Sequence, residues 1–153
     1  MYDEDCDCIT RDIIVHDVEV MTLDKPNKND RIYSSDVVSR TLKNSEFPIF
    51  GQIGMPDLRT LPDPYDALKV PEDKVSHRVE RLTIKDGSLF ADIRLLRTPQ
   101  GLVLQNLFNQ NPNAFKDRVK FRTAGITQLG SDGKEITNFT LYAINAIDAA
   151  LAA

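Results

Sequence analysis

The side chains best suited to acid–base catalysis in this sequence are its two histidines, His16 and His77. Histidine titrates near neutral pH, so it can accept or donate a proton during a reaction. Each of the two lies in an alternating, strand-like stretch, on the face that also carries valines. A histidine in that setting is more often a core residue held by a hydrogen bond than a catalyst. We therefore expect both rings to point inward.

Other common catalytic patterns are missing from the sequence. No glycine-rich stretch ends in Gly-Lys-Ser or Gly-Lys-Thr, as a phosphate-binding loop would, and the two histidines do not have the spacing of a zinc site. The 23 Asp and Glu residues leave carboxylate chemistry open, but their spacing selects no pair. We predict neither a cofactor nor a metal ion.

The two cysteines, Cys6 and Cys8, are separated by one residue in an acidic stretch. A disulfide between residues so close together would be strained. The two thiolates could bind a soft metal ion, but a tetrahedral site needs further ligands, and no histidine is nearby. We favour the simpler interpretation, in which residues 1–10 form a flexible acidic tail with free thiols.

Length and composition indicate a small, single-domain protein. A chain of 153 residues with 41% hydrophobic content can bury one core. The net charge is −4 and no basic stripe is present, which argues against direct nucleic-acid binding. Apolar runs are too short to span a bilayer, and the acidic N-terminus does not resemble a signal peptide. We expect no membrane association and a cytosol-like compartment.

Alternating apolar and polar residues predict six strands, which cover residues 11–23, 47–53, 73–84, 88–96, 117–130 and 135–147. Serine or threonine caps predict two helices, at residues 34–45 and 98–110. The fold class expected is α+β: a mainly antiparallel β-sheet or small β-barrel with two or so inserted helices. We assign residues 11–148 to one domain and residues 149–153 to a loose tail.

The stretch PIFGQIGMPD, residues 48–57, is an apolar strand that stops at Met55 and the proline after it. A long irregular loop, residues 56–73, follows and contains four prolines. Loops of that length in a small domain often have a function or line an interface. Judged on its residues alone, Met55 would be an ordinary packing residue.

Four segments together resemble a known family. NKNDRIYSSDVVSRTL (27–42) is similar to that family's Asn-x-Asn-Gly-Arg-Ile-Tyr opening, and PIFGQIGMPD (48–57) to its Gly-Glu-Leu-x-His-Pro strand end. Residues 75–108 resemble its Ser-His strand, the hairpin and the Thr-Pro-x-Gly helix start. Residues 119–133 resemble its Ser-Ser-Arg-Gly strand, and residues 136–148 resemble its final strand, which ends in Ile-Asp. The family is the prohead maturation proteases of large contractile-tailed phages, which share the fold of herpesvirus assemblin proteases.

The resemblance implies proteolysis by a serine nucleophile that a histidine base activates. Met55 stands where the family has its catalytic histidine, and a thioether cannot act as the base near neutral pH. Arg122 or Thr123 stands where the nucleophilic serine would fall, and Ala124 replaces the family's arginine. These replacements indicate a catalytically degenerate member. One fallback pair remains, Thr123 with His77, because both are expected on apolar strand faces.

Three functions follow as hypotheses. The first is a non-catalytic virion protein that binds the major capsid protein or another virion component. It would act as a cement, inner-shell or joining protein, and it could also associate with copies of itself. Such a protein would be assembled in the host cytoplasm, and residues 56–73 and the acidic N-terminus would be its natural contact segments. The second is an active serine-type or Thr-dependent maturation protease that cleaves capsid and scaffold proteins. The third is an unrelated host domain that binds a small ligand.

Overall fold

A computed structural model of the chain describes residues 13–27, 30–54 and 70–147. These residues form six strands: β1 Ile13–Thr22, β2 Ile49–Gly51, β3 His77–Lys85, β4 Ser88–Leu95, β5 Lys120–Leu129 and β6 Ile136–Ile147. They also form three α-helices, α2 Ser35–Asn44, α4 Pro99–Gln110 and α5 Phe115–Arg118, and two 3₁₀ turns, η1 Glu72–Lys74 and η2 Pro112–Ala114.

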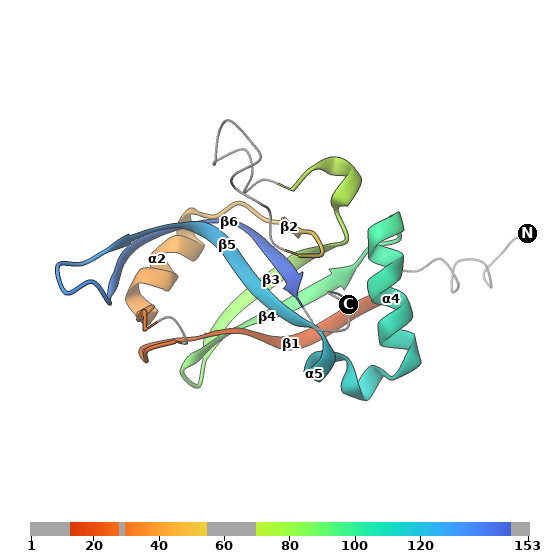
Figure 1. Ribbon diagram of the computed structural model, residues 1–153, viewed down its shortest axis with the longest axis horizontal. Coiled ribbons are helices and arrows are strands. Elements are labelled where there is room, and N and C mark those ends of the chain that lie inside the picture. Colours follow the sequence, from red (N-terminus) through yellow and green to blue (C-terminus); the bar gives the residue numbers. More distant parts are fainter. Residues whose placement is uncertain (1–12, 28–29, 55–69, 148–153) are drawn as a thin grey trace, which may run out of the picture.

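The strands form two antiparallel sheets, which confirms the predicted α+β fold class (Figure 1). The larger sheet has four strands in the order β1-β4-β3-β2, and the smaller one pairs β5 with β6. Both hairpins close at glycine-containing turns, and Asp86 and Gly87 between β3 and β4 both have positive φ. An Asp-Gly pair at that position matches the type I′ turn that two-residue hairpins prefer.

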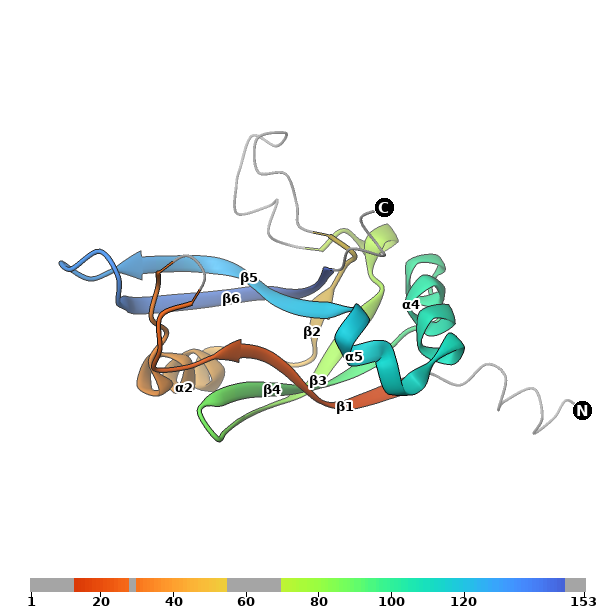
Figure 2. The ribbon, with the colours of Figure 1, turned by 60° about the horizontal axis from the view of Figure 1, so that its bottom comes forward.

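One segment belongs to both sheets. Its first part, β2, pairs antiparallel with β3, and the residues after it run parallel to β6 through a bridge between Ile53 and Ala146. The Gly54 N–H donates to the Ala146 carbonyl at 2.8 Å, and the Ala146 N–H donates to the Gln52 carbonyl at 2.9 Å. The two sheets are therefore joined along one side and enclose a common core (Figure 2).

The core lies between the inner faces of the two sheets. Its fully buried side chains include Val79, Ile93 and Leu95 from the larger sheet and Phe121 and Ile144 from the smaller one. The helices α2 and α4 lie at opposite ends of the two layers (Figures 1 and 2). Both begin as predicted, because the Ser34 hydroxyl accepts the Val37 N–H and the Thr98 hydroxyl accepts the Gly101 N–H.

The prediction that His16 points inward is wrong. Its side chain is 68% exposed and lies 3.4 Å from an Asp92 carboxylate oxygen. The cause is a β-bulge between Val15 and Val18, since two residues of β1, His16 and Asp17, lie opposite the single residue Asp92 of β4. The extra residue is accommodated by the backbone of Asp17, which has a φ of 54°. As a result, Val15 and Val18 both face the core.

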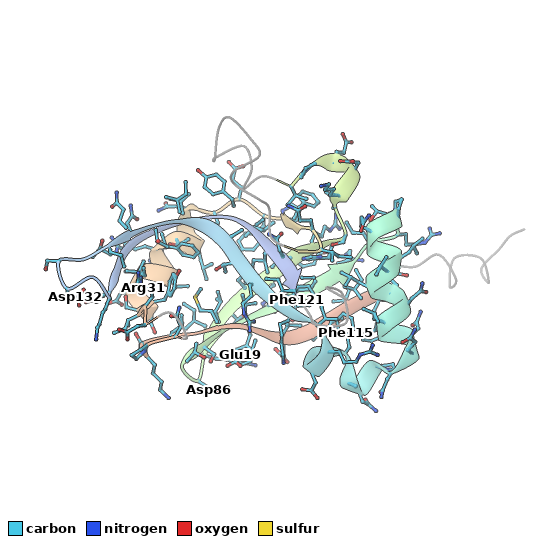
Figure 3. All side chains as sticks on the ribbon, in the orientation of Figure 1. Glu19, Arg31, Asp86, Phe115, Phe121 and Asp132 are labelled. Carbon is cyan, nitrogen blue, oxygen red and sulfur yellow. The ribbon has the colours of Figure 1, made fainter. Side chains whose placement is uncertain are left out.

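Two element boundaries also differ from the prediction. The first two residues of the strand expected at residues 117–130 belong to α5, and β5 begins only at Lys120. Phe115 of α5 packs into the core against Phe121 of β5 (Figure 3), with ring centroids 6.4 Å apart. The strand expected at residues 73–84 starts late, at His77, after the turn η1.

Some predictions fall outside the described residues. They concern the tails at residues 1–10 and 149–153, both cysteines and most of the loop at 56–73. The assignment of residues 11–148 to one domain stays a prediction. Among the described residues, no helix is long and apolar enough to cross a membrane. The same residues contain no group of three or more His, Cys, Asp or Glu side chains that could hold a metal ion.

Candidate functional site

His77 lies in the core, where β3 pairs with both β2 and β4. It is the first residue of β3 and pairs with Gly51 on one side and Leu95 on the other. Its side chain is completely buried and packs edge-on against the Phe121 ring, with centroids 5.0 Å apart and planes at 82°. The ring therefore bridges the inner faces of the two sheets.

Both nitrogens of the His77 ring have hydrogen-bond partners. Nε2 is 2.6 Å from the carbonyl oxygen of Ile144 on β6, and Nδ1 is 2.7 Å from the hydroxyl of Ser76. A carbonyl can only accept, so Nε2 carries the proton in the neutral ring, and Nδ1 then accepts the hydroxyl proton of Ser76. Burial lowers the pKa of His77 from its usual 6.5 to about 4. The ring is therefore neutral near pH 7.

Gly51 is required for this arrangement. A Cβ at residue 51 would lie 1.9 Å from the Ile144 carbonyl oxygen and 2.2 Å from Nε2 of His77. Real Cβ atoms do not approach other atoms that closely, so only glycine lets β2, the imidazole and β6 meet. The Gly51 carbonyl also accepts the Ser76 N–H at 3.0 Å.

Thr123 and Arg122 are neighbours on β5. Thr123 pairs with Ile144 in register and is half-buried, while Phe121 and Val119, two and four residues earlier in the chain, are fully buried. Arg122 is exposed, and its Nη1 donates to the carbonyl of Phe121 at 3.0 Å. The guanidinium thus lies along the backbone of the strand that carries it.

A cavity of about 600 Å³ lies between β1 and β5, the two strands that form the outer edges of their sheets. Arg122 and Thr123 line it from β5. Glu19, which is labelled in Figure 3, lines it from β1. The Glu19 carboxylate accepts the Ser88 hydroxyl at 2.6 Å. Lys25 and Tyr33, from the segment after β1, also line the cavity. Its volume suits a small ligand or a few residues of a peptide.

The structure brings some of the predicted site residues together and leaves others apart. Thr123 and His77 both lie near Ile144, since Thr123 pairs with that residue and the His77 ring bonds its carbonyl. However, both ring nitrogens are already bonded, to Ser76 and Ile144, so neither is directed at the Thr123 hydroxyl. Met55 lies outside the described residues. The last described residue before it, Gly54, is bonded to β6 at Ala146.

Sequence reasoning missed two features of this region. One is the Ser76 hydroxyl as a partner of His77; a serine directly before a histidine in a strand was the available signal. The other lies on the outer face of the larger sheet, where the Glu80 carboxylate is bonded by the guanidinium groups of Arg78 and Arg94. These bonds, chiefly that from Arg94, lower the pKa of Glu80. The residues concerned are adjacent only after the strands pair.

Comparisons with known proteins support the fold. No protein-family model matches the sequence, and no curated protein matches it either. One similar solved structure is the bacteriophage T4 capsid assembly protease, gp21, with a TM-score of 0.58 and 15% sequence identity. The similarity covers 88% of this chain and 90% of that one. At that level of identity, the similarity shows a prohead-protease-like fold and nothing finer.

Proposed function

We propose that this chain is a non-catalytic relative of the phage prohead proteases that binds the capsid or another virion component. Its fold is similar to that of a capsid assembly protease. A protease has to recognise its substrate proteins before it cuts them. A copy that has lost the catalytic residues can retain this recognition surface. A cement, inner-shell or joining role in the particle would use that surface, although similarity of fold alone does not determine function.

The observation that carries the proposal is the state of the residues at the expected nucleophile and base. Arg122 cannot act as a nucleophile, and its guanidinium is bonded to the backbone of its own strand. Thr123 could attack a carbonyl only if a base removed its proton. His77, the histidine of the fallback pair, is buried and bonded through both nitrogens. Met55 occupies the sequence position of the family's base.

The expected consequence for catalysis is large. In a serine-protease triad, removing the nucleophile or the base costs about a millionfold in rate, and losing both costs little more. A protein with that deficit would turn over no substrate during the assembly of a particle. Binding would survive, because recognition depends on the shape and chemistry of surfaces that the catalytic side chains do not form.

A second function, an active serine-type or Thr-dependent maturation protease, is favoured by one observation. Thr123 is half-buried and lines the cavity between β1 and β5, whose volume could hold a few residues of a peptide. This protease would need His77 to exchange its bonds with Ser76 and Ile144 for a bond with Thr123. Residues 56–73 and the acidic N-terminus are the proposed contact segments of the non-catalytic virion protein.

A cleavage assay separates the two functions. We expect the purified chain, incubated with the capsid and scaffold proteins of its own phage, to leave them intact on a gel. Thr123→Val, which replaces the hydroxyl with a methyl group of similar shape, should give the same result. Cleavage at defined sites that Thr123→Val or His77→Gln abolishes would overturn the proposal and establish the protease.

Particle composition provides an independent test of the structural role. Mass spectrometry of purified virions, with copy counting, should find the intact chain in stoichiometric amounts. Maturation proteases commonly digest themselves and leave the particle, so the same experiment distinguishes the two functions again. If mature particles lack the chain while immature ones contain it, the proposed structural role is wrong.

A further inference from the structure

The Ser76 hydroxyl has two acceptors within reach and a single proton to donate. Its oxygen lies 2.7 Å from Nδ1 of His77 and 3.3 Å from the carbonyl oxygen of Gly51. Ser76 and His77 are both completely buried, and His77 pairs with Gly51 where β3 meets β2. A hydroxyl donates one hydrogen bond and can accept two. The proton of Ser76 is therefore directed at one of these acceptors at a time.

The protonation state of the ring decides which acceptor the hydroxyl uses. Near pH 7 the Ile144 carbonyl accepts the proton of Nε2, so Nδ1 has a lone pair and accepts the Ser76 hydroxyl. The Gly51 carbonyl accepts the Ser76 N–H at 3.0 Å, and a carbonyl oxygen has a second lone pair. The longer distance to this carbonyl fits an acceptor that the hydroxyl uses only when Nδ1 cannot accept.

Hydrogen bonds, and not ion pairs, surround the His77 ring. The residues that pair with it or contact it come from four strands and are uncharged: Gly51 of β2, Leu95 of β4, Phe121 of β5 and Ile144 of β6. The charged neighbours of these positions in the chain, Arg78, Arg94 and Arg122, are partly or fully exposed. Among residues 13–27, 30–54 and 70–147, no charged side chain shifts the pKa of the ring. A proton on the ring is therefore stabilised by its hydrogen-bond acceptors.

We propose that the Ser76 hydroxyl is a two-position switch, which lets His77 take up a proton from solvent while the junction between the sheets stays closed. When Nδ1 gains a proton, it becomes a donor and can no longer accept. The hydroxyl then turns its own proton to the Gly51 carbonyl, and its oxygen accepts the new N–H. Nε2 keeps its bond to the Ile144 carbonyl, because it donates in both states. The hydroxyl and both ring nitrogens thus have partners before and after the proton arrives.

A hydroxyl that could only donate would have the opposite effect. Protonation of Nδ1 would then leave two donors facing each other, and the junction would open. A hydroxyl that turns accepts a bond from a charged donor, and such bonds are roughly twice as strong as neutral ones. It therefore favours the charged ring, although it bonds the neutral ring as well. The consequence is an acid form of the protein in which β2, β3 and β6 stay joined.

NMR of the full-length chain with ¹⁵N-labelled histidine tests this switch, because the chain has only two histidines. At pH 7 His77 should be neutral, with its proton on Nε2, and the exposed His16 serves as an internal control. On acidification both nitrogens of His77 should become protonated, while the amide protons of Ser76 and Ala146 stay protected from solvent exchange. Loss of that protection as the ring is protonated would overturn the proposal. So would unfolding of the chain before His77 titrates.

Ser76→Ala reveals the sign of the hydroxyl's effect. Without the hydroxyl, the Nδ1–H of the charged ring has no acceptor, so the proton affinity of folded His77 should fall about tenfold. Ser76→Thr retains a hydroxyl and should titrate as the wild type does. Ser45→Ala removes a hydroxyl that bonds the Thr41 carbonyl instead, and it should leave the titration unchanged.

A higher proton affinity in Ser76→Ala would mean that the hydroxyl only donates to the ring, and the switch would be wrong. If Ser76→Ala does not fold, the exchange measurement on the wild type decides the question. Both measurements follow the ring itself, so their outcome does not depend on whether the chain binds a capsid.

Discussion

Gly51→Ala is expected to reduce the free energy of unfolding by about 3–5 kcal/mol, the largest effect we anticipate from a single substitution. The added methyl group would overlap the Ile144 carbonyl oxygen at 1.9 Å and Nε2 of His77 at 2.2 Å. Neither atom can yield easily, because one belongs to the backbone of β6 and the other to a ring held at both nitrogens. The junction between the sheets would have to open.

Chemical denaturation at neutral pH measures this effect, and Gly130→Ala is its control. A Cβ at residue 130 would first meet the Thr137 methyl group at 3.2 Å, the far end of a side chain that can move. We expect Gly130→Ala to change the unfolding free energy by less than about 1 kcal/mol. If Gly51→Ala proves as mild as its control, the close contact of β2 with β6 does not hold the sheets together as described.

The elements of this fold that local sequence signals specify could be predicted, and those that depend on strand pairing could not. Local signals identified the helices, because Ser34 and Thr98 cap the residues directly after them. The Asp-Gly turn between β3 and β4 was equally local. The bulge at Asp17 was not, since it is defined by the pairing of β1 with β4, and it turned His16 from the core to the surface. A four-residue helix such as α5 is too short to leave a periodic pattern.

The candidate site was predictable only in part for the same reason. The pattern of β3 indicated that His77 is buried, and it is. Its bond to Ile144 joins residues 67 positions apart, so no local pattern could reveal it. Gly51 also gave no sign that its missing side chain matters, because the atoms it would strike come from β3 and β6. The absence of a base at Met55 rests on resemblance, and that residue lies outside the described part of the chain.

Acidification below pH 6.5 is expected to destabilise the protein through His77, by about 3 kcal/mol once the pH reaches 4. Burial holds the pKa of the folded ring at about 4, against 6.5 for an ordinary histidine. Above pH 6.5 the ring is neutral in both states, so stability is complete there. Between pH 6.5 and 4 the His77 ring is protonated in the unfolded chain and still neutral in the folded chain, so acidification favours unfolding. Below pH 4 both states are protonated and the loss stays constant.

The wild type and His77→Gln, measured across this pH range, isolate the effect. Carboxylates titrate in both proteins, so their contribution largely cancels in the difference between the two unfolding free energies. That difference should fall by about 3 kcal/mol from pH 7 to pH 4. As a control, His16→Gln shows how the same substitution changes the unfolding free energy at an exposed histidine. A difference that stays flat would mean that the ring takes up a proton in the folded state as readily as in water.

The outcome of that titration also bears on function. A general base needs a pKa near the working pH and a nitrogen that can reach the group it deprotonates. A pKa of about 4 would leave the His77 ring a weak base, and the bonds to Ser76 and Ile144 occupy both nitrogens. A flat profile would instead indicate a ring open to water, and the Thr123–His77 pair would become the better hypothesis. The pH dependence of stability can therefore weigh the structural role of His77 against the catalytic one before any substrate is known.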